Sequence, residues 1–457
     1  MRYDRVPSHA HCWLLPIAYS SLRSDCHWVI SDRSQGRALM KITFVVTVPD
    51  SLAFFSEHLR HWKGRQADQG DHAEVLTSPG PAEFLQLALK HGIPVRQVPM
   101  EREIRPLRDL YSLWQLCAEL RRDRPDLIHI GTPKAALLAG MAAVLTRVPG
   151  RIYTMHGLRA ETTQGPKRAL LLLAERVAVA CAHEVVLPSH SLHAYVRSLG
   201  LLPPHKGRVL GSGSFSGIRS HEVSLPTAER LRRDLGLHSQ GPVIGFVGRL
   251  VRDKGVAELC RAFAEVQRHY PAAQLLLLGQ FEEGDPLDEA TRQFIQQQPG
   301  VIWGGYVFNV RDHYPLMDVF ALPTYREGFP TVSLEAAASG LAVISTTATG
   351  ARDAVQPGET GWQVPPGDVP ALTLALLEAL DDPVERRRRG SNAQAWVQSE
   401  FSPETVMRHW DELYEEVLAR AQARRRVRGK VGWTAAALGS LALTALTVRT
   451  QFSCPRQ

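Results

Sequence analysis

Cysteine is scarce in this chain of 457 residues, and its six cysteines form no pattern. No Cys-x-x-Cys pair is present, so the sequence indicates neither a disulfide framework nor a zinc site. Cys117, Cys181 and Cys260 fall in apolar helical patterns and are expected as small core residues, which suits a reducing compartment. The histidines and cysteines between residues 9 and 27 fit no zinc template, and no metal site is predicted from them.

Long apolar runs are also few. The apolar patch at residues 13–18 is short and broken by Pro16, which does not match a signal peptide. Residues 431–448 are the exception, because they contain no charged side chain and are at the lower limit of length for crossing a bilayer. A helix lying on the membrane surface and an unstructured alanine-rich tail are the two alternatives for this segment.

Positive charge exceeds negative charge by seven, and basic residues gather in two places. Five arginines and a lysine crowd residues 420–430, directly before the apolar segment, and would keep the preceding chain on the cytoplasmic side of a membrane. The arginines at 386–389 are expected on a solvated helix face. Basic clusters also suit nucleic acids, but no nucleic-acid partner is predicted here.

From Met40 onwards, short apolar runs alternate with amphipathic stretches, and the alternation restarts after Pro203 and Pro204. The expected strands are 42–47, 73–76, 95–98, 127–130, 151–154 and 184–187 in the first half, and 242–248, 274–278, 301–303, 319–322 and 341–345 in the second. The expected helices include 105–122, 256–270, 370–380 and 403–420. Strands that are apolar throughout indicate parallel sheets covered on both faces. The sequence therefore predicts an α/β fold of two Rossmann-like, doubly wound domains facing a central cleft.

The domain boundaries follow from this pattern. Residues 1–39 show no clear period and are expected to be a disordered extension or an artefact of start-site choice. The two Rossmann-like domains are expected at 40–204 and 205–400. A C-terminal helix and basic stretch (401–430) and a candidate membrane segment (431–449) follow.

The first motif with chemical meaning is a pair of cations after a buried strand. Strand 242–248 ends at Gly248, and Arg249 and Lys254 follow at the entrance to a helix. Helix-start amides and two cations suit a diphosphate group. A strand-to-helix loop with solvated cations is the alternative.

The second motif is a pair of carboxylates around a helix start. Glu327 lies in a loop, Pro330 is favoured in a first helical turn, and Glu335 follows on the helix. Gly328 allows backbone amides to approach a ligand closely. Carboxylates suit hydroxyl recognition, because each can accept two hydrogen bonds. The alternative places Glu327 against the helix dipole and Glu335 on a solvated face.

Taken together, these motifs resemble the retaining glycosyltransferases of the GT-B fold, family 4, over about residues 40 to 415. The resemblance implies that Arg249 and Lys254 hold the donor diphosphate, that Glu335 holds the ribose and that Glu327 contacts the donor sugar. It also implies that residues 40–204 are the acceptor side and 205–400 the donor side. The amides around Gly328, Phe329 and Pro330 would contact the sugar or the diphosphate.

The same resemblance assigns a histidine in the first half. Strand 151–154 is followed by His156 and Gly157, where the family places a histidine that faces the donor sugar. We expect His156 to form a hydrogen bond with the sugar and not to abstract a proton. Relatives often have a Gly-Gly loop after the first strand, but residues 49–55 here carry side chains. Phe54 and Phe55 in that loop fit either an acceptor-lipid entrance or the core.

Shorter segments at 105–106, 125–129, 132–135 and 347–353 resemble capsule and lipid-linked oligosaccharide transferases. The implied reaction moves a sugar from a nucleotide-diphosphate donor, such as a UDP-sugar of the N-acetylhexosamine kind, to a glycan or polyprenyl-diphosphate-linked acceptor. No cofactor or divalent metal is expected, because no Asp-x-Asp pair stands near these motifs. The enzyme is expected in the cytoplasm at the inner membrane face. A sugar-nucleotide epimerase of the same fold and a non-catalytic nucleotide-sugar binding protein are the alternatives.

Overall fold

The computed structural model describes the backbone of residues 39–238 and 240–430, and side chains up to residue 423. The expected extension, apart from its last residue, and the candidate membrane segment 431–449 lie outside this range, as do the histidines and cysteines between residues 9 and 27. Within the described chain, no helix is long and apolar enough to span a membrane.

The N-terminal sheet has six parallel strands, as predicted. Their order is β3 (Val95–Gln97), β2 (His72–Thr77), β1 (Lys41–Val45), β4 (Leu127–Ile130), β5 (Gly150–Thr154) and β6 (Glu184–Val186). Strand β1 lies in the middle, and Phe44 pairs with Val75 on one side and His129 on the other. Short turns of 3-10 helix follow two strands, η1 (Pro49–Phe55) after β1 and η2 (Arg159–Glu161) after β5.

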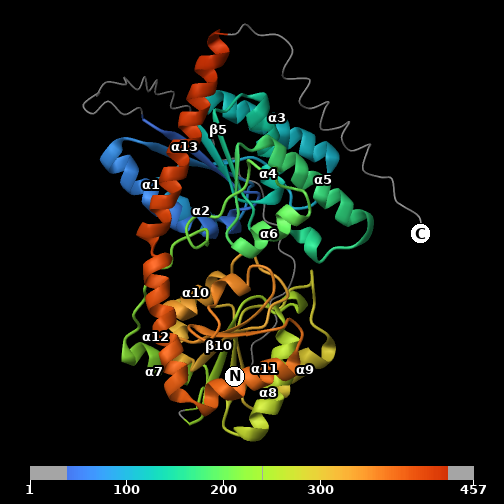
Figure 1. Cartoon of the computed structure of the whole chain (residues 1–457), viewed down its shortest axis with the longest axis vertical. Coiled ribbons are helices and arrows are strands. Elements are labelled where there is room, and N and C mark those ends of the chain that lie inside the picture. The colour runs from blue at the N-terminus through green and yellow to red at the C-terminus, as the bar shows by residue number, and fades with distance from the viewer. Residues whose placement is uncertain (1–38, 239, 431–457) are drawn as a thin grey trace, which may run out of the picture. The chain divides into compact units, whose positions relative to one another are not determined.

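Helices cover both faces of this sheet (Figure 1). One face is packed by α3 (Pro106–Asp123), α4 (Pro133–Leu145), α5 (Gly165–Cys181) and α6 (His190–Ser198). The other is packed by α1 (Ser56–Gln69), α2 (Ala82–Leu89) and α13 (Pro403–Lys430), the last helix of the described chain. The arrangement confirms the doubly wound fold.

The C-terminal sheet also has six parallel strands. Their order is β12 (Gly361–Val364), β11 (Val343–Thr346), β10 (Val319–Leu322), β7 (Val243–Val247), β8 (Gln274–Leu278) and β9 (Val301–Gly305). Its helices are α7 (Leu225–Asp234), α8 (Val256–His269), α9 (Glu289–Gln297), α10 (Thr331–Ala338), α11 (Val369–Asp381) and α12 (Pro383–Glu400). Turns of 3-10 helix are η3 (Arg252–Lys254), η4 (Val310–Leu316) and η5 (Arg352–Ala354).

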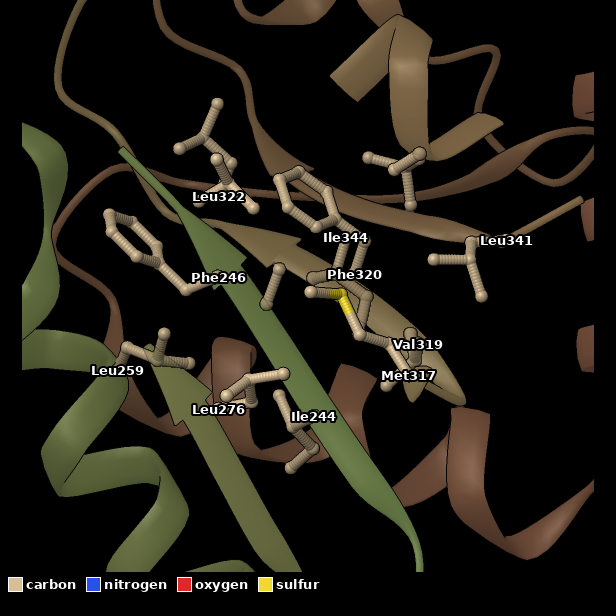
Figure 2. Packing of buried hydrophobic residues seen from close by; sticks show 14 of the residues in the cluster. Ile244, Phe246, Leu259, Leu276, Met317, Val319, Phe320, Leu322, Leu341 and Ile344 are labelled. Atoms are coloured by element: carbon tan, nitrogen blue, oxygen red, sulfur yellow. The ribbon is translucent and has the colours of Figure 1, made fainter. Parts of the chain in front are cut away.

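The core of this domain shows why β7 contains a glycine. A Cβ atom at Gly245 would lie 2.0 Å from the sulfur of Met317. Figure 2 shows that sulfur against the strand, between Ile244 and Phe320 of the same apolar cluster. The glycine therefore allows Met317 to pack where a larger residue would force the strands or the side chain to move.

Helix α13 belongs to the N-terminal core, although it follows the whole C-terminal domain in sequence. Trp410 is fully buried there, and its indole nitrogen donates to the Phe215 carbonyl oxygen at 3.0 Å. The hydroxyl of Tyr414 lies 2.8 Å from Nδ1 of His129 in the middle of the sheet. Residues 208–215 also pack on this sheet, beyond the predicted boundary at residue 204.

Strand β12 was not predicted, and of helix α12 only the helix face at residues 386–389 was expected. Strand β12 is short, begins with Gly361 and mixes polar with apolar residues, so it has no strand pattern. Helix α12 buries only the small side chains at Gly390, Ala393 and Val397 and has no apolar stripe. Its arginines correct a prediction, because two of the four at 386–389 do not lie on a solvated face. Arg386 and Arg389 are only 13% and 11% exposed and pair with acids.

Two further predictions hold only in part. Cys117 and Cys260 are buried, as expected, but Cys181 is partly exposed. The helix predicted at residues 105–122 is confirmed as α3, but its large apolar side chains lie on two faces. Leu116, Cys117 and Leu120 are buried, whereas Leu107, Leu110 and Trp114 face solvent.

A carboxyl group in the N-terminal core should make stability depend on pH. Glu175 of α5 accepts a hydrogen bond from the Tyr153 hydroxyl at 3.0 Å, and burial raises the pKa of Glu175 from 4.5 to about 7. The stability that the neutral carboxyl supports is complete below pH 4.5 and is lost as the pH rises to about 7. The shift corresponds to at most about 3 kcal/mol.

We therefore expect Glu175→Gln to unfold at higher urea concentration than the wild type above pH 7 and at a similar concentration near pH 4.5. The glutamine keeps a polar contact with Tyr153 without carrying a charge. Glu229→Gln, at an exposed position of α7, is the control and should leave the wild-type pH profile unchanged. An equal pH dependence in wild type and Glu175→Gln would contradict the prediction.

Candidate functional site

The predicted site residues follow the carboxyl ends of three parallel strands. His156 follows β5 of the N-terminal sheet, Gly248 follows β7, and Glu327 lies in the loop after β10. Strands that run parallel end at the same edge of a sheet, where doubly wound proteins bind their ligands. Residues far apart in the sequence are thus available to one site.

The loops that follow β5 and β10 meet at Gly328. A Cβ atom at this position would lie 1.8 Å from the carbonyl oxygen of His156. The Ser189 hydroxyl donates to the Gly328 carbonyl oxygen at 2.6 Å, and the Glu327 amide donates to the Thr349 carbonyl oxygen at 2.8 Å. The loop that holds the first predicted carboxylate is therefore fixed directly against the predicted histidine.

This contact makes Gly328→Ala a sharp test of the site. The added methyl group cannot fit without separating the two loops, so we expect transfer activity to fall by about 100-fold, as for a misplacement of about 1 Å at a reacting centre. Gly284→Ala is the control, because nothing lies within 4 Å of a Cβ atom there. The measurement is the steady-state transfer rate of each purified variant. Full activity of Gly328→Ala would show that the close contact is not needed.

Lys254 and Glu327 form an ion pair between Nζ and Oε1, and both side chains are largely buried. Their loops are tied together by Asp253, whose carboxylate accepts from Arg326 at 2.8 Å and whose carbonyl oxygen accepts from the Tyr325 amide at 2.9 Å. The predicted diphosphate lysine and the predicted sugar carboxylate are therefore neighbours.

Arg249 is placed differently from Lys254. Its guanidinium pairs with Glu282 at 2.8 Å, and its side chain is 56% exposed. Gly248 is held in the sheet by its amide, which donates to the Leu278 carbonyl oxygen at 2.9 Å. The alternative of a solvated cation thus describes Arg249 in part, but not Lys254, which is only 17% exposed.

Glu335 does not lie on a solvated helix face, so the alternative interpretation of its position in the sequence is wrong. Its carboxylate is mostly buried beside the alanines of α10 and accepts from Arg311 Nε and the Tyr314 hydroxyl, both at 3.2 Å. Burial raises the pKa of Glu335, and the charge of Arg311 opposes the shift. Arg311 and Tyr314 lie in η4 and were not predicted, since nothing in the sequence links that turn to α10.

The side chains of Phe329 and Pro330 pack within the domain. The Phe329 ring packs 5.6 Å from the ring of Phe401, and Pro330 is buried as the residue before the first turn of α10. The predicted helix start near Pro330 is confirmed.

His156 is held between two aromatic rings. Phe54 stacks on it with ring centroids 4.8 Å apart, and Phe215 meets it edge-on at 4.5 Å. Burial lowers the pKa of His156 to about 4, so the imidazole is neutral at pH 7. Its Nε2 atom is buried and has no hydrogen-bond partner among the described residues. A neutral ring with an unpartnered nitrogen suits hydrogen bonding to a ligand.

The same contacts separate the two phenylalanines that the sequence left open. Phe55 is completely buried and belongs to the core, whereas Phe54 is 48% exposed beside His156.

A second link between the sheets lies at the start of α6. The Ser191 hydroxyl contacts the carboxylate of Asp353, the Ser191 amide donates to the same carboxylate at 3.2 Å, and the Gly350 amide donates to the hydroxyl at 2.7 Å. For residues 347–353, the sequence showed only a resemblance to capsule and lipid-linked oligosaccharide transferases and no contact with α6. Ser189 and Ser191 were missed, because single serines carry no sequence signal.

A hollow of about 490 Å³ lies next to this link, lined among others by His190, Arg352, Asp353 and Trp396. None of the predicted site residues lines it, so we do not assign the donor there. Among residues 39–238 and 240–430, no three histidine, cysteine, aspartate or glutamate side chains converge as a metal site would require.

Comparison with known proteins is consistent with this geometry. Residues 241–382 match the family described as glycosyl transferases group 1, and residues 55–213 match the glycosyl transferase 4-like domain. The chain is 32% identical to the capsular polysaccharide biosynthesis glycosyltransferase CapM of Staphylococcus aureus, over 84% of this chain and 99% of CapM. It is 24% identical, over 62% of this chain and 73% of the relative, to the Escherichia coli UDP-Gal:alpha-D-GlcNAc-diphosphoundecaprenol alpha-1,3-galactosyltransferase.

Among solved structures, HepE of Anabaena in complex with UDP and glucose superimposes with a TM-score of 0.70 at 22% identity, over 82% of this chain and all of HepE. At this level of identity, the match shows a common fold.

Proposed function

Because this chain belongs to the group 1 glycosyltransferases and has their GT-B fold, we propose that it transfers a sugar from a UDP-sugar to a polyprenyl-diphosphate-linked glycan with retention at the anomeric carbon. It is a glycosyltransferase of capsule or polysaccharide biosynthesis. The single observation that carries the finer proposal is that the Lys254–Glu327 ion pair lies next to Gly328, which is in close contact with the backbone of His156.

In this proposal, Lys254 and Arg249 neutralise the donor diphosphate. Both cations pair with carboxylates, Lys254 with Glu327 and Arg249 with Glu282, so a bound diphosphate would exchange one anionic partner for another. As the bond to the sugar breaks, negative charge grows on the leaving diphosphate. Fixed positive groups at that position lower the barrier, because they stabilise the transition state more than the bound donor.

Glu335 would hold the ribose, and Glu327 and His156 the donor sugar. Glu335 is oriented by Arg311 and Tyr314 and can accept further hydrogen bonds from two ribose hydroxyls. His156 would meet a sugar hydroxyl through Nε2, which is consistent with the neutral state of its imidazole.

Retention would follow from attack on the face that the diphosphate leaves. The bond between the anomeric carbon and the diphosphate oxygen breaks, the acceptor hydroxyl oxygen bonds to that carbon on the same face, and the hydroxyl proton passes to the leaving phosphate oxygen. Glu327 is an unsuitable covalent nucleophile, since its carboxylate is engaged by Lys254. No metal is needed in this scheme, because the two cations supply the charge.

The acceptor and the location of the enzyme rest on relatives and sequence. The name of the Escherichia coli relative gives a diphosphoundecaprenol-linked sugar as its acceptor. A lipid-linked acceptor lies in a membrane, and the basic stretch at 420–430 would bind the anionic inner face of the cell membrane. We therefore place the enzyme in the cytoplasm, at that surface.

The test is a screen of nucleotide sugars, N-acetylhexosamine donors included, against polyprenyl-diphosphate-linked glycans, with the anomeric configuration of the product measured by NMR. A product with the donor's configuration is expected. An inverted product would refute retention. Conversion of the donor's sugar without acceptor would favour an epimerase, and donor binding without turnover would favour a binding protein.

A further inference from the structure

The first half of α3 turns a row of large apolar side chains to solvent. We call this row the α3 face; it comprises Ile104 just before the helix, and Leu107, Leu110, Tyr111 and Trp114 on it. The five side chains are 51% to 86% exposed, and the rings of Tyr111 and Trp114 stack with centroids 6.1 Å apart. Spacings of three and four residues put them on one side of the helix, opposite the side that Leu116 and Leu120 bury in the core. Exposed apolar side chains scattered singly need no explanation, but a continuous row does.

Positive charge borders the α3 face. Arg102, Arg105 and Arg108 precede or flank it and are 64%, 52% and 67% exposed. Their neighbouring acids are less exposed, at 44% for Asp50, 31% for Glu101 and 16% for Asp109. Glu103 is exposed as well. At the far end of the helix, Arg122 is 59% exposed, whereas its partners Glu119 and Asp123 are 22% and 6% exposed. The charge that reaches solvent around the apolar row is therefore mainly that of arginines.

The α3 face also lies close to the predicted site. Arg102 forms an ion pair with Asp50 in η1, the turn that carries Phe54 against His156. Lys134, at the start of α4, binds both the Glu103 carbonyl oxygen at 2.7 Å and Asp109 at 2.6 Å. The start of α3 is thus fixed to the carboxyl-end edge of the N-terminal sheet, which is the acceptor side of the proposed reaction.

From this placement, we propose that the α3 face rests on the surface of an anionic membrane and presents the acceptor side of the site to a lipid-linked substrate. The proposal rests on the proposed function for the nature of the acceptor. A helix with alkyl and aromatic side chains on one face and arginines around it is the composition of helices that lie in a membrane interface. Tyrosine and tryptophan favour that zone, and arginine can bury its stem there while its charge stays in water. A stable protein interface uses about 20–30 residues on each side, which is far wider than this single row.

The binding test uses flotation of the full chain with vesicles of phosphatidylcholine and phosphatidylglycerol. The test variant carries both Leu107→Gln and Trp114→Gln. The control variant carries both Leu374→Gln and Val384→Gln, at similarly exposed positions of the C-terminal domain. Losing two inserted side chains should lower the partition coefficient at least about tenfold, and the control should match the wild type. The C-terminal segment is the same in all three proteins. All four substituted side chains are exposed, so both variants should fold like the wild type. Their circular dichroism spectra should therefore match the wild-type spectrum.

Hydrogen exchange gives a second, local readout. Amides of residues 104–115 should exchange more slowly in the presence of these vesicles in the wild type, and not with vesicles of phosphatidylcholine alone. Unchanged flotation of the α3 variant and unchanged exchange at 104–115 would each overturn the proposal. A variant that turns a wild-type dimer into a monomer, with vesicle binding intact, would instead assign the α3 face to a second copy of the chain.

The activity measurement separates this proposal from the proposed function. The α3 variant should lose transfer to a lipid-linked acceptor in vesicles but keep transfer to a water-soluble analogue of the same sugar. If no sugar is transferred to any acceptor, the proposed function fails, while the flotation result still decides whether the α3 face binds membranes.

Discussion

Replacing both Arg249 and Lys254 by alanine is expected to lower the rate of sugar transfer by about 1,000-fold or more. Each cation stabilises charge that appears on the diphosphate only as the donor bond breaks, and removing one such group from an active site costs about 2.7–4 kcal/mol in other enzymes. The reduction should appear mainly in kcat, because the charge is larger in the transition state than in the bound donor.

The fold should survive this double change. Arg249 is exposed and pairs with an equally accessible Glu282, so its loss costs little stability. Lys254 leaves Glu327 without its partner, but the loop is still tied by Asp253 to Arg326 and Tyr325. Arg268→Ala, which removes an exposed ion pair with Glu265 on α8, is the matched control and should keep full activity. Wild-type turnover in the double variant, measured with saturating donor, would remove the two cations from the mechanism.

The second large effect is expected at Glu335. In Glu335→Ala, the donor KM should rise by about 100-fold with a smaller change in kcat, because ribose contacts act in the ground state and the transition state alike. The two hydrogen bonds to a carboxylate account for this size, because each contributes a net of about 1.5 kcal/mol or more when one partner is charged. An unchanged donor KM would contradict the ribose assignment.

Glu335→Gln gives a pH readout that a purely structural role would not alter. Burial raises the pKa of Glu335 above the ordinary carboxyl value, so the charged acceptor is lost at higher pH than for a surface glutamate. In the wild type, donor affinity should therefore weaken on the acid side as Glu335 is protonated. The glutamine variant should bind donor weakly at all pH values and lack this acid limb. Tyr314→Phe, which removes one of the groups that orient Glu335, should fall between the two.

The sequence was sufficient for the two sheets and for placing His156, Gly248 and Glu327 after strand ends, because buried parallel strands are apolar throughout. The functional roles of these residues stay predictions. The three alanines that follow Glu335 agree with its buried position, but the sequence left a solvated helix face as the alternative, and only the structure excludes it. Contacts made by single polar residues could not be anticipated. Nothing local to Arg311, Ser189 or Ser191 shows that they reach across to another element; only the folded chain brings them there.

The α3 helix shows a different limit. A stripe of apolar residues at helical spacing predicts that this side of the helix is covered. It does not show whether the protein's own core or an outside partner covers it. Both outcomes occur in α3. Cys117 is buried in the core, whereas Trp114, three residues before it, is exposed. The two faces could be separated only once the neighbouring helix α4 was in place.

The return of α13 to the N-terminal sheet sets an order of events during synthesis. The cluster formed by Phe44, Trp62 and Phe215 is closed by Trp410 and Tyr414, which leave the ribosome roughly 200 residues later. At about 5–20 residues per second, this interval lasts on the order of tens of seconds. Throughout it, the apolar residues that α13 later covers lack this helix, and only α1 and α2 pack on that side of the sheet. The C-terminal domain, by contrast, has its whole core before α13 begins.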